Sequence, residues 1–268
     1  MAASDFTDTW AQGFDLERHY KRIVSLVPSL TETLFDLGCG ERLVGRTDYC
    51  IHPADAVAAV PSVGGVKTPN IEAILALKPD LVLMDQDENR RADAEALIAA
   101  GVQVFATAPR SVQDALNVLW DLTSLLGTTA QAGIRIQAIE RAYDWTRGAS
   151  QFLAPMRVFC PVWRDPWTTF NANTYPHDLL RTCGAENVFA DREARYPRVT
   201  LDQVTECAPD LILLPNEPFA FTAADAADVK AHPPLAKAPV RFLDGSLLFW
   251  PGTRLARALA ELPPLLRP

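Results

Sequence analysis

The sequence lacks any run of about 18 or more apolar residues, so we expect no membrane-spanning helix. It also lacks a basic excess: 33 acidic residues outnumber 25 lysines and arginines, and the formal charge is −8. Proteins that bind nucleic acid gather Lys and Arg against phosphates, so this balance argues against such a partner. The opening "MAASDFTDTWAQGFDLERHYKR" lacks the basic start and apolar stretch of a secretory signal, which predicts a cytoplasmic chain unless a signal has been removed.

Paired cysteines are missing as well. The five cysteines are odd in number, include no C-x-x-C and show no pair at the spacing of zinc ligands. They are Cys39, Cys50, Cys160, Cys183 and Cys207. We therefore expect scattered, partly buried thiols and no metal site, and the pattern does not decide whether a disulfide forms.

Motifs of the common catalytic sites are also absent. The sequence contains no G-x-S-x-G, no H-E-x-x-H and no G-x-x-x-x-G-K loop. The first predicted strand continues as "RIVSLVPSLTE", without the glycines that a dinucleotide-binding turn needs. Acidic pairs such as Asp85 and Asp87 lie in "DQDENRRADAE", which is typical of a solvated helix start. We therefore predict a binding protein, not an enzyme, with no intrinsic cofactor.

Short apolar strands alternate with helices over the first half of the chain. Strands are predicted at residues 22–27, 42–47, 81–84 and 102–107, and helices at residues 71–77, 92–101 and 111–127. A further helix is predicted to begin with a cap at Ser29 or Thr31. This alternation indicates a mostly parallel sheet with helices on its faces.

One module occurs twice. The stretch "IEAILALKPDLVLM" at residues 71–84 returns in looser form as "LDQVTECAPDLILLP" at residues 201–215. Each copy has an acidic residue, a short helix, Pro-Asp and an apolar strand. The surrounding order repeats too, with strands at "MRVFCPV" and "APVRFL" and helices at "PHDLLRTCG" and "PGTRLARALAEL". The sequence therefore predicts two lobes of the same architecture.

Helical periodicity without a strand signal follows the first lobe, and we predict one long helix at residues 129–147. The predicted fold is α/β: two Rossmann-like lobes with parallel sheets, joined by this helix, with a ligand cleft between the lobes. The predicted boundaries are an N-terminal tail at residues 1–20, an N-terminal lobe at 21–127, the linking helix at 128–154 and a C-terminal lobe at 155–268.

Residues that follow the strands are the candidates for a ligand site, because ligands of open parallel sheets bind beyond the carboxyl ends of the strands. The second lobe adds a concentration of aromatic residues in its predicted loops. Such rings hold large flat ligands through apolar burial and stacking. The predicted ligand-binding residues are Ser29, Tyr49, Gln86, Trp163, Trp167, Phe170, Asn216 and Trp250.

Five stretches carry a family likeness over most of residues 22–215: "RIVSLVPSLTETLFDLG", "LVGRTDYCIHP", "NIEAILALKPDLVL", "LLRTCGAENVFAD" and "VTLDQVTECAPDLILL". They resemble the substrate-binding proteins of ABC importers for cobalamin, haem and ferric siderophores, whose lobes are bridged by one rigid helix. The resemblance implies a monomer that captures a metal chelate between its lobes with little closure and then docks on a membrane permease. It also implies a periplasmic or cell-surface location.

The resemblance extends to permease docking. In this family one carboxylate at the top of each lobe pairs with arginines of the permease dimer, and the matching positions here are Glu72 and Asp202. Each begins a short predicted helix, where exposed backbone N–H groups and the helix dipole stabilise a carboxylate. Asp202 is one methylene shorter than the glutamate usual in the family.

The identity of the chelate stays open. Tyr49 matches a cobalamin-contacting tyrosine of the family, but the family's first-lobe tryptophans are missing from "PSVGGV" and "LMDQDEN". Haem or Fe(III) would use Tyr or His, and the candidates are Tyr49, His52, Tyr175 and His177. An anionic siderophore would need cations, and the candidates are Arg46, Lys67 and Arg164. The alternative function is a cytoplasmic carrier or sensor of a corrinoid or metal chelate without a transport role.

Overall fold

The computed structural model describes residues 19–267, in which strands and helices alternate along the chain. The chain divides into two units. Unit 1 holds the residues up to Pro109 together with Gln113–Ala138 and Gly252–Arg254, and unit 2 holds Arg110–Val112, Ile139–Pro251 and the residues from Leu255 onward. The predicted α/β class is confirmed, because each unit is built on a four-stranded parallel sheet.

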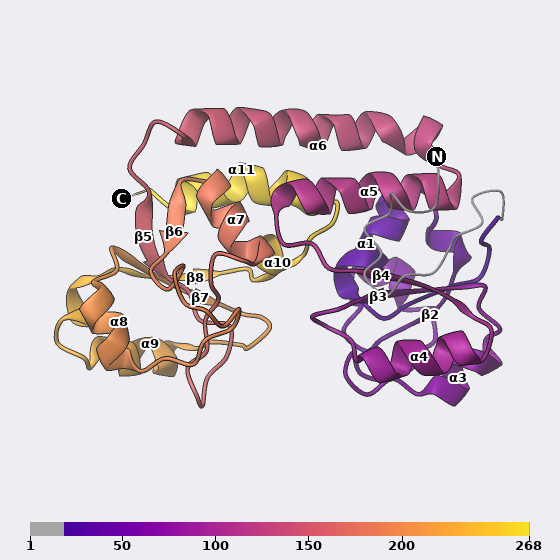
Figure 1. The fold of residues 1–268 in the computed structure, drawn as a ribbon, viewed down its shortest axis with the longest axis horizontal. Helices are drawn as coiled ribbons and strands as arrows, with labels where there is room; N and C mark the ends of the chain where they lie inside the picture. The colour runs from indigo at the N-terminus through magenta and orange to yellow at the C-terminus, as the bar shows by residue number, and fades with distance from the viewer. Residues whose placement is uncertain (1–18, 268) are drawn as a thin grey trace. The chain divides into compact units, whose positions relative to one another are not determined.

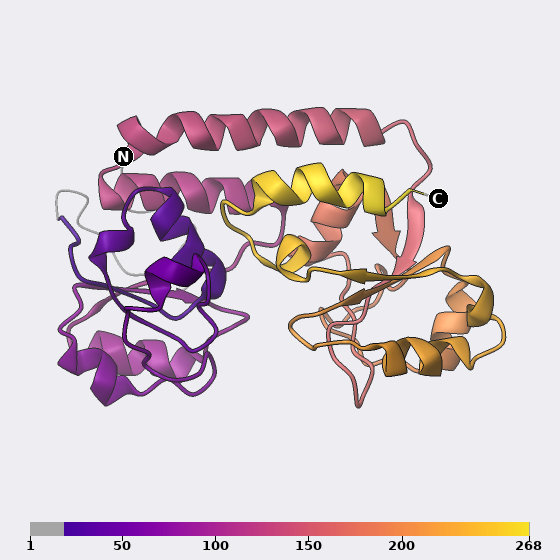
Figure 2. The same cartoon turned by 180° about the vertical axis from the view of Figure 1, so that it is seen from behind.

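Unit 1 has the strand order β2-β1-β3-β4. Its strands are β1 (Ile23–Ser25), β2 (Leu43–Arg46), β3 (Leu81–Asp85) and β4 (Gln103–Thr107). Its helices are α1 (Pro28–Asp36), α2 (Ala54–Val57), α3 (Ile71–Ala76), α4 (Arg91–Ala99) and α5 (Val112–Leu126), with a 3-10 turn at Gly40–Arg42. Figure 1 and Figure 2 show α3 and α4 on one side of this sheet and α1 and α5 on the other.

The core of unit 1 follows from the alternation of side chains along its strands. Val82 and Met84 of β3 pack with Ile74 of α3 and Leu97 of α4, and all four side chains are fully buried. Burying an apolar side chain of this size contributes about 1.5–3 kcal/mol. Because helices cover both faces of the sheet, β3 is buried along its whole length, as is typical of a parallel sheet.

Unit 2 has the strand order β6-β5-β7-β8. As in unit 1, the strand that comes first in the sequence lies second in the sheet. Its strands are β5 (Met156–Phe159), β6 (Ala185–Asn187), β7 (Leu211–Pro215) and β8 (Val240–Leu243). Its helices are α7 (Tyr175–Thr182), α8 (Leu201–Cys207), α9 (Ala223–Lys230), α10 (Ser246–Phe249) and α11 (Leu255–Leu265), with a 3-10 turn at Leu235–Lys237. Val204 of α8 and Val229 of α9 cover one face of the sheet by packing on Ile212 and Leu214 of β7.

The repeated module makes the same backbone clamp in unit 1 and in unit 2. In unit 1 the Asp80 carboxylate accepts hydrogen bonds from the backbone N–H groups of Lys21 and Arg22, both at 2.9 Å. In unit 2 the Asp210 carboxylate accepts one from the N–H of Arg157 at 3.0 Å. Each aspartate precedes the central strand β3 or β7 and holds the start of the neighbouring strand β1 or β5. The Pro-Asp turns therefore have a structural role.

The arginines of these clamps also have equivalent partners. The guanidinium of Arg22 donates to the carbonyl oxygen of Leu77, just after α3, at 2.6 Å. The guanidinium of Arg157 donates to the carbonyl oxygen of Cys207, the last residue of α8, also at 2.6 Å. Helix ends leave carbonyl groups without partners, and these side chains satisfy one in each unit.

The long helix is α6 (Thr129–Ser150), which confirms the helix predicted at residues 129–147 and extends it. Its first part, up to Ala138, belongs to unit 1 and the remainder to unit 2. No helix within residues 19–267 is both long enough and apolar enough to cross a membrane. The five cysteines all lie in this part of the chain as free thiols, and Cys207 alone among them is not buried.

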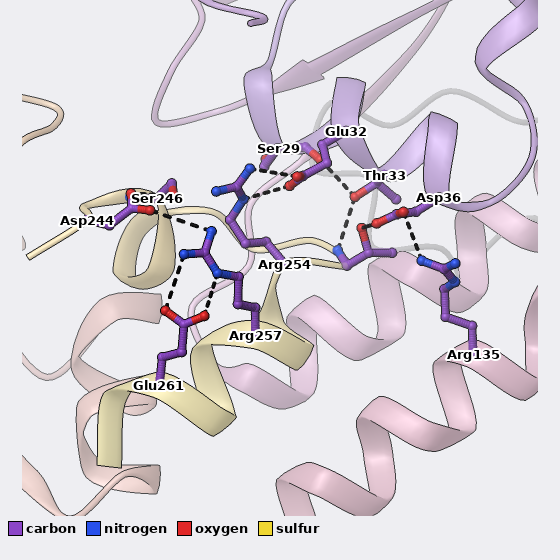
Figure 3. A network of polar contacts seen from close by, with 11 residues as sticks. Ser29, Glu32, Thr33, Asp36, Arg135, Asp244, Ser246, Arg254, Arg257 and Glu261 are labelled. Carbon is purple, nitrogen blue, oxygen red and sulfur yellow. Dashed lines mark hydrogen bonds and ion pairs between the residues drawn. The ribbon is translucent and has the colours of Figure 1, made fainter. Parts of the chain in front are cut away.

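The short segment Gly252–Arg254 packs on α1 within unit 1, as Figure 3 shows. The Arg254 guanidinium makes two hydrogen bonds to the Glu32 carboxylate, at 2.7 and 2.6 Å. The Thr253 hydroxyl donates to the Asp36 carboxylate at 2.6 Å. A segment far from α1 in the sequence is thereby fixed to it by charged and neutral hydrogen bonds.

Helix α1 begins at Pro28, so the predicted cap at Ser29 or Thr31 is wrong. Proline has a backbone angle that suits the first helical turn, and its missing N–H needs no partner there. The Thr31 hydroxyl donates backward, to the Val27 carbonyl oxygen at 3.0 Å, instead of capping the helix.

Candidate functional site

Asn89 holds together the carboxyl edge of the unit 1 sheet. Its side-chain oxygen accepts a hydrogen bond from the N–H of Asp85 at 2.8 Å. Its amide nitrogen donates to the carbonyl oxygens of Leu26, which follows β1, and Val66, in the loop before α3, at 3.2 and 3.1 Å. The Asn89 side chain is buried, so these bonds satisfy groups that water does not reach. They fix two strand ends and one loop in a single arrangement.

Asp85 is a buried carboxylate at the same edge. It accepts hydrogen bonds from the Thr107 hydroxyl at 2.7 Å and from the N–H of Asp87 at 2.9 Å. Burial raises the pKa of Asp85 to about 6, and these hydrogen bonds limit the rise. The carboxylate shapes the turn that leaves Gln86 and Asp87 exposed.

Of the predicted ligand residues in unit 1, Tyr49 and Gln86 are exposed and Ser29 is buried. Tyr49, in the loop beyond β2, keeps 64% of its surface exposed. Ser29 lies in the first turn of α1 beneath Gly252, where an added Cβ would come within 3.0 Å of the Ser29 carbonyl oxygen. Tyr49 and Gln86 can therefore reach a ligand from the surface, whereas the Ser29 hydroxyl is enclosed.

The predicted cations of unit 1 make hydrogen bonds to backbone carbonyl groups. Arg46 donates to the carbonyl oxygens of Val57 and Thr47, both at 3.0 Å. The Lys67 ammonium donates to the carbonyl oxygen of Asp87 at 2.7 Å. Both side chains therefore shape the loops at this edge.

A cluster of four aromatic rings occupies the carboxyl edge of the unit 2 sheet. Trp163 meets Phe219 edge to face with ring centroids 5.4 Å apart, and Phe219 lies 4.8 Å from Phe221. Trp167 stacks on Phe221 at 5.7 Å with an angle of 5° between the rings. Trp163 is 50% exposed, whereas Phe221 is buried. The cluster is therefore anchored in the core and presents Trp163 and part of Phe219 at the surface.

Arg164 is neutralised by carboxylates beside this cluster. Its guanidinium forms ion pairs with Asp225 and Asp228. The pKa of Asp225 is held below its usual range, because the hydrogen bonds from Arg164 and Thr222 outweigh the effect of desolvation. The guanidinium also lies 5.2 Å from the centre of the Trp167 ring. Arg164, the predicted cation of unit 2, thus orders the aromatic cluster. The charge of its guanidinium is already compensated by the carboxylates.

Of the remaining predicted ligand residues of unit 2, two are buried and one is exposed. Phe170 is fully buried and meets Phe249 edge to face at 6.1 Å. Trp250 is buried as well. Asn216 is exposed, and its side-chain oxygen accepts a hydrogen bond from the N–H of Gly245 at 2.7 Å. Asn216 thereby ties the loop after β7 to the loop after β8.

The candidate metal ligands of unit 2, Tyr175 and His177, are both buried in α7. Burial raises the pKa of Tyr175 and lowers that of His177. The Tyr175 hydroxyl and the His177 Nδ1 have no hydrogen-bond partner among residues 19–267. Within residues 19–267 no group of three His, Cys, Asp or Glu side chains could hold a metal ion. Exposed Tyr49 and half-buried His52 are the other predicted metal ligands.

Glu72 and Asp202 occupy the same place in the two modules. Each is the second residue of its helix, α3 or α8, and each is exposed. Asn70 caps α3 and Thr200 caps α8 by accepting a hydrogen bond from a backbone N–H of the first turn, at 3.0 and 3.2 Å. One carboxylate therefore projects from the same capped first turn in each unit.

Phe219 and Asn89 were not among the predicted site residues. Phe219 follows β7 in "NEPFAF", so the rule that selected Asn216 also reaches it. Asn89 gives no comparable signal, because its role depends on three backbone groups that are far apart in the sequence.

Three comparisons relate this chain to known proteins. A family model described as periplasmic binding protein matches residues 23–239. The vitamin B12-binding protein of Yersinia pestis is 30% identical over 196 residues, which cover 72% of this chain and 69% of the relative. The fold is shared with the periplasmic vitamin B12 binding protein BtuF of Vibrio cholerae, with a TM-score of 0.77, 24% identity and coverage of 92% and 96%. The heme-binding protein BhuT, solved with two hemes, gives a TM-score of 0.79, 25% identity and coverage of 92% and 97%.

Proposed function

We propose that this chain, which belongs to the periplasmic binding protein family, captures a metal chelate and delivers it to an ABC importer. The observation that carries the proposal is the exposed edge of the aromatic cluster, Trp163 with Phe219, beyond the carboxyl ends of the unit 2 strands. Relatives that bind vitamin B12 and heme support the ligand class.

The ligand class that best fits this surface is a metal tetrapyrrole, a corrinoid or haem. A flat macrocycle gains from apolar burial and from ring contacts with Trp163 and Phe219. An anionic ferric siderophore would gain most from an uncompensated guanidinium, and Arg164 already pairs with Asp225 and Asp228. We therefore rank ferric siderophores below the tetrapyrroles as the proposed ligand of this surface.

Tyr49 is the second proposed ligand contact. Its ring is exposed beyond β2, and its phenol oxygen is a possible axial ligand for haem iron. A Tyr49→Phe variant separates the two tetrapyrroles: it keeps the ring for a corrinoid but removes the oxygen that haem iron would use.

Delivery would use Glu72 and Asp202. Both carboxylates are exposed at equivalent positions of a duplicated module, which suits a permease with two equivalent halves. We propose that each meets a basic side chain of the permease, where exposed charge pairs guide docking more than they add affinity.

Tryptophan fluorescence tests the proposed ligand class. The protein is titrated with cyanocobalamin, haemin and a ferric siderophore, with absorbance corrections for each chelate. We expect saturable quenching by at least one tetrapyrrole at micromolar concentration. Quenching by the siderophore alone would contradict the assignment of the class, and no quenching by any chelate would contradict solute capture itself.

A further inference from the structure

Unit 2 contains a hollow of about 970 Å³ at the amino edge of its sheet, opposite to the aromatic cluster. It lies between the end of α6 and the end of α11, over the starts of β5 and β7. The lining includes Trp145, Leu153, Met156, Leu259, Arg241 and Arg267. Its volume is at the upper end of the range of about 300–1,000 Å³ that is usual for small-molecule sites. We call it the amino-edge hollow.

The duplicated architecture allows the start of β5, beside the hollow, to be compared with the start of β1 in unit 1. The clamps make Arg22 of unit 1 equivalent to Arg157 of unit 2. Two residues before Arg22, the Tyr20 side chain is fully buried in unit 1. Two residues before Arg157 stands Pro155, which is exposed and lines the hollow. At this matched position unit 1 has a buried tyrosine and unit 2 has an exposed proline.

The rim of the hollow exposes large apolar side chains. Trp145 is 80% exposed, and Leu153 is 59% exposed. Phe152, next to Leu153 in the chain, is 86% exposed. Exposed apolar residues gathered around a concave site mark a place for an apolar ligand group more than scattered surface residues do.

The polar side chains of the hollow include two cations, Arg241 and Arg267, beside Thr146, Ser150 and the acidic Asp210. The Arg241 guanidinium donates to the carbonyl oxygens of Leu265 and Arg267. Neither Arg241 nor Arg267 pairs with a carboxylate in the part of the chain that the structure describes. The Asp210 carboxylate lies in the lining too, but it accepts the N–H of Arg157. The hollow thus combines a largely apolar lining with two guanidinium groups that pair with no carboxylate among residues 19–267.

We propose that the amino-edge hollow binds a free long-chain carboxylate, a fatty acid, with its chain against Trp145, Leu153 and Leu259 and its head group near Arg241 and Arg267. An apolar chain gains about 25 cal/mol per Å² of surface removed from water, and a guanidinium can hold a carboxylate through two hydrogen bonds. The amino-edge hollow lies at the opposite edge of the sheet from the proposed chelate site. An experiment that refutes one proposal therefore leaves the other untouched.

The test is a calorimetric titration of the delipidated full chain with palmitate below its critical micelle concentration. Ala260 lines the hollow from an exposed position on α11, so Ala260→Trp fills the hollow without entering the core. Ala256 is exposed on the same helix outside the lining, and Ala256→Trp is the matched control. We expect one palmitate site with micromolar affinity, a loss of about tenfold or more in Ala260→Trp, and no change in Ala256→Trp.

A charge variant tests the head-group end. Arg267→Gln should weaken palmitate binding several-fold, whereas Arg141→Gln, at an exposed arginine of α6 outside the lining, should not. Absence of palmitate binding by the folded wild type overturns the proposal, as does equal binding by Ala260→Trp. Recruitment to vesicles of an anionic phospholipid without binding of free palmitate would also overturn it, because the face would then meet a membrane surface.

Discussion

The Asp80 carboxylate and the backbone N–H of Arg22 lie 2.9 Å apart, and this hydrogen bond joins the turn before β3 to the start of β1. Unit 2 repeats the relationship between Asp210 and Arg157 at 3.0 Å. The Pro-Asp pair of the repeated module therefore has a structural role. Glu72 and Asp202 are acidic residues exposed at matching positions of the two copies, and the proposed docking role rests on them.

Removing either clamp should destabilise the protein. Asp80→Ala and Asp210→Ala each leave backbone N–H groups without their carboxylate, and we expect each to lower the free energy of unfolding by about 1–2 kcal/mol. Urea unfolding followed by circular dichroism measures this. Glu206→Ala, at an exposed position of α8, is the control and should change it by less than about 0.5 kcal/mol. Aspartate variants as stable as the control would show that the clamps are dispensable.

Two arginines near the C-terminus should differ sharply in their contribution to stability. The Arg254 side chain is 7% exposed and pairs with Glu32, whereas the Arg257 side chain is 51% exposed and pairs with Glu261 (Figure 3). Arg254→Ala leaves a carboxylate in a poorly hydrated place and should cost about 3 kcal/mol or more. Arg257→Ala removes an exposed pair and should cost about 1 kcal/mol or less. Equal losses in thermal or urea unfolding would refute this distinction.

The buried carboxylate of Asp85 gives stability a specific pH dependence. Its folded-state pKa is raised to about 6, above the unfolded value, so protonated Asp85 favours the folded state at low pH. This contribution is fully present below the unfolded pKa and is lost as the pH rises through about 6. Asp85→Asn removes this titrating group. The free energy of unfolding of the variant minus that of wild type should therefore increase by on the order of 2 kcal/mol between pH 4 and pH 7.

Urea unfolding of wild type and Asp85→Asn at several pH values in this window measures the effect. Glu88 is a nearby carboxylate in the same turn that is not buried, and Glu88→Gln is the matched control. A difference between Asp85→Asn and wild type that stays constant with pH would contradict the raised pKa.

Permease docking should be separable from solute capture. Glu72→Ala and Asp202→Ala should leave chelate affinity unchanged and reduce uptake in a reconstituted transport assay, with the double variant most affected. Asp202→Glu restores the longer side chain and should transport at least as well as wild type. Weaker chelate binding by either alanine variant would contradict a docking role, and unimpaired transport by the double variant would exclude it.

The architecture could be predicted from the sequence because its signals are local. The apolar run of β3 and the long periodic stretch of α6 each identify an element without knowledge of the rest. The three-residue strand β6 has no comparable run, and the small residues of α9 carry no clear apolar stripe. These two elements were missed because tertiary packing defines them more than their own sequence does.

The candidate site was less predictable, because a sequence does not say which way a loop side chain points. Trp163 and Phe170 are both loop aromatics beyond β5, yet Trp163 is half-exposed and Phe170 is fully buried. The same limit applies to Arg164, which is hydrogen-bonded to two carboxylates 61 and 64 residues along the chain. Arg164 was predicted as a cation for an anionic siderophore, and the fold supplies its counter-ions.

The most direct test of the account is a calorimetric titration with cyanocobalamin and haemin of three proteins: wild type, Trp163→Ala and Phe242→Ala. Phe242 is the matched control, because it is an exposed aromatic residue of unit 2 on β8 and not part of the aromatic cluster. We predict micromolar or tighter binding of at least one tetrapyrrole by wild type, a loss of about tenfold or more in Trp163→Ala, and unchanged affinity in Phe242→Ala. Equal affinity in all three proteins would contradict the claim that the aromatic edge of unit 2 holds the ligand.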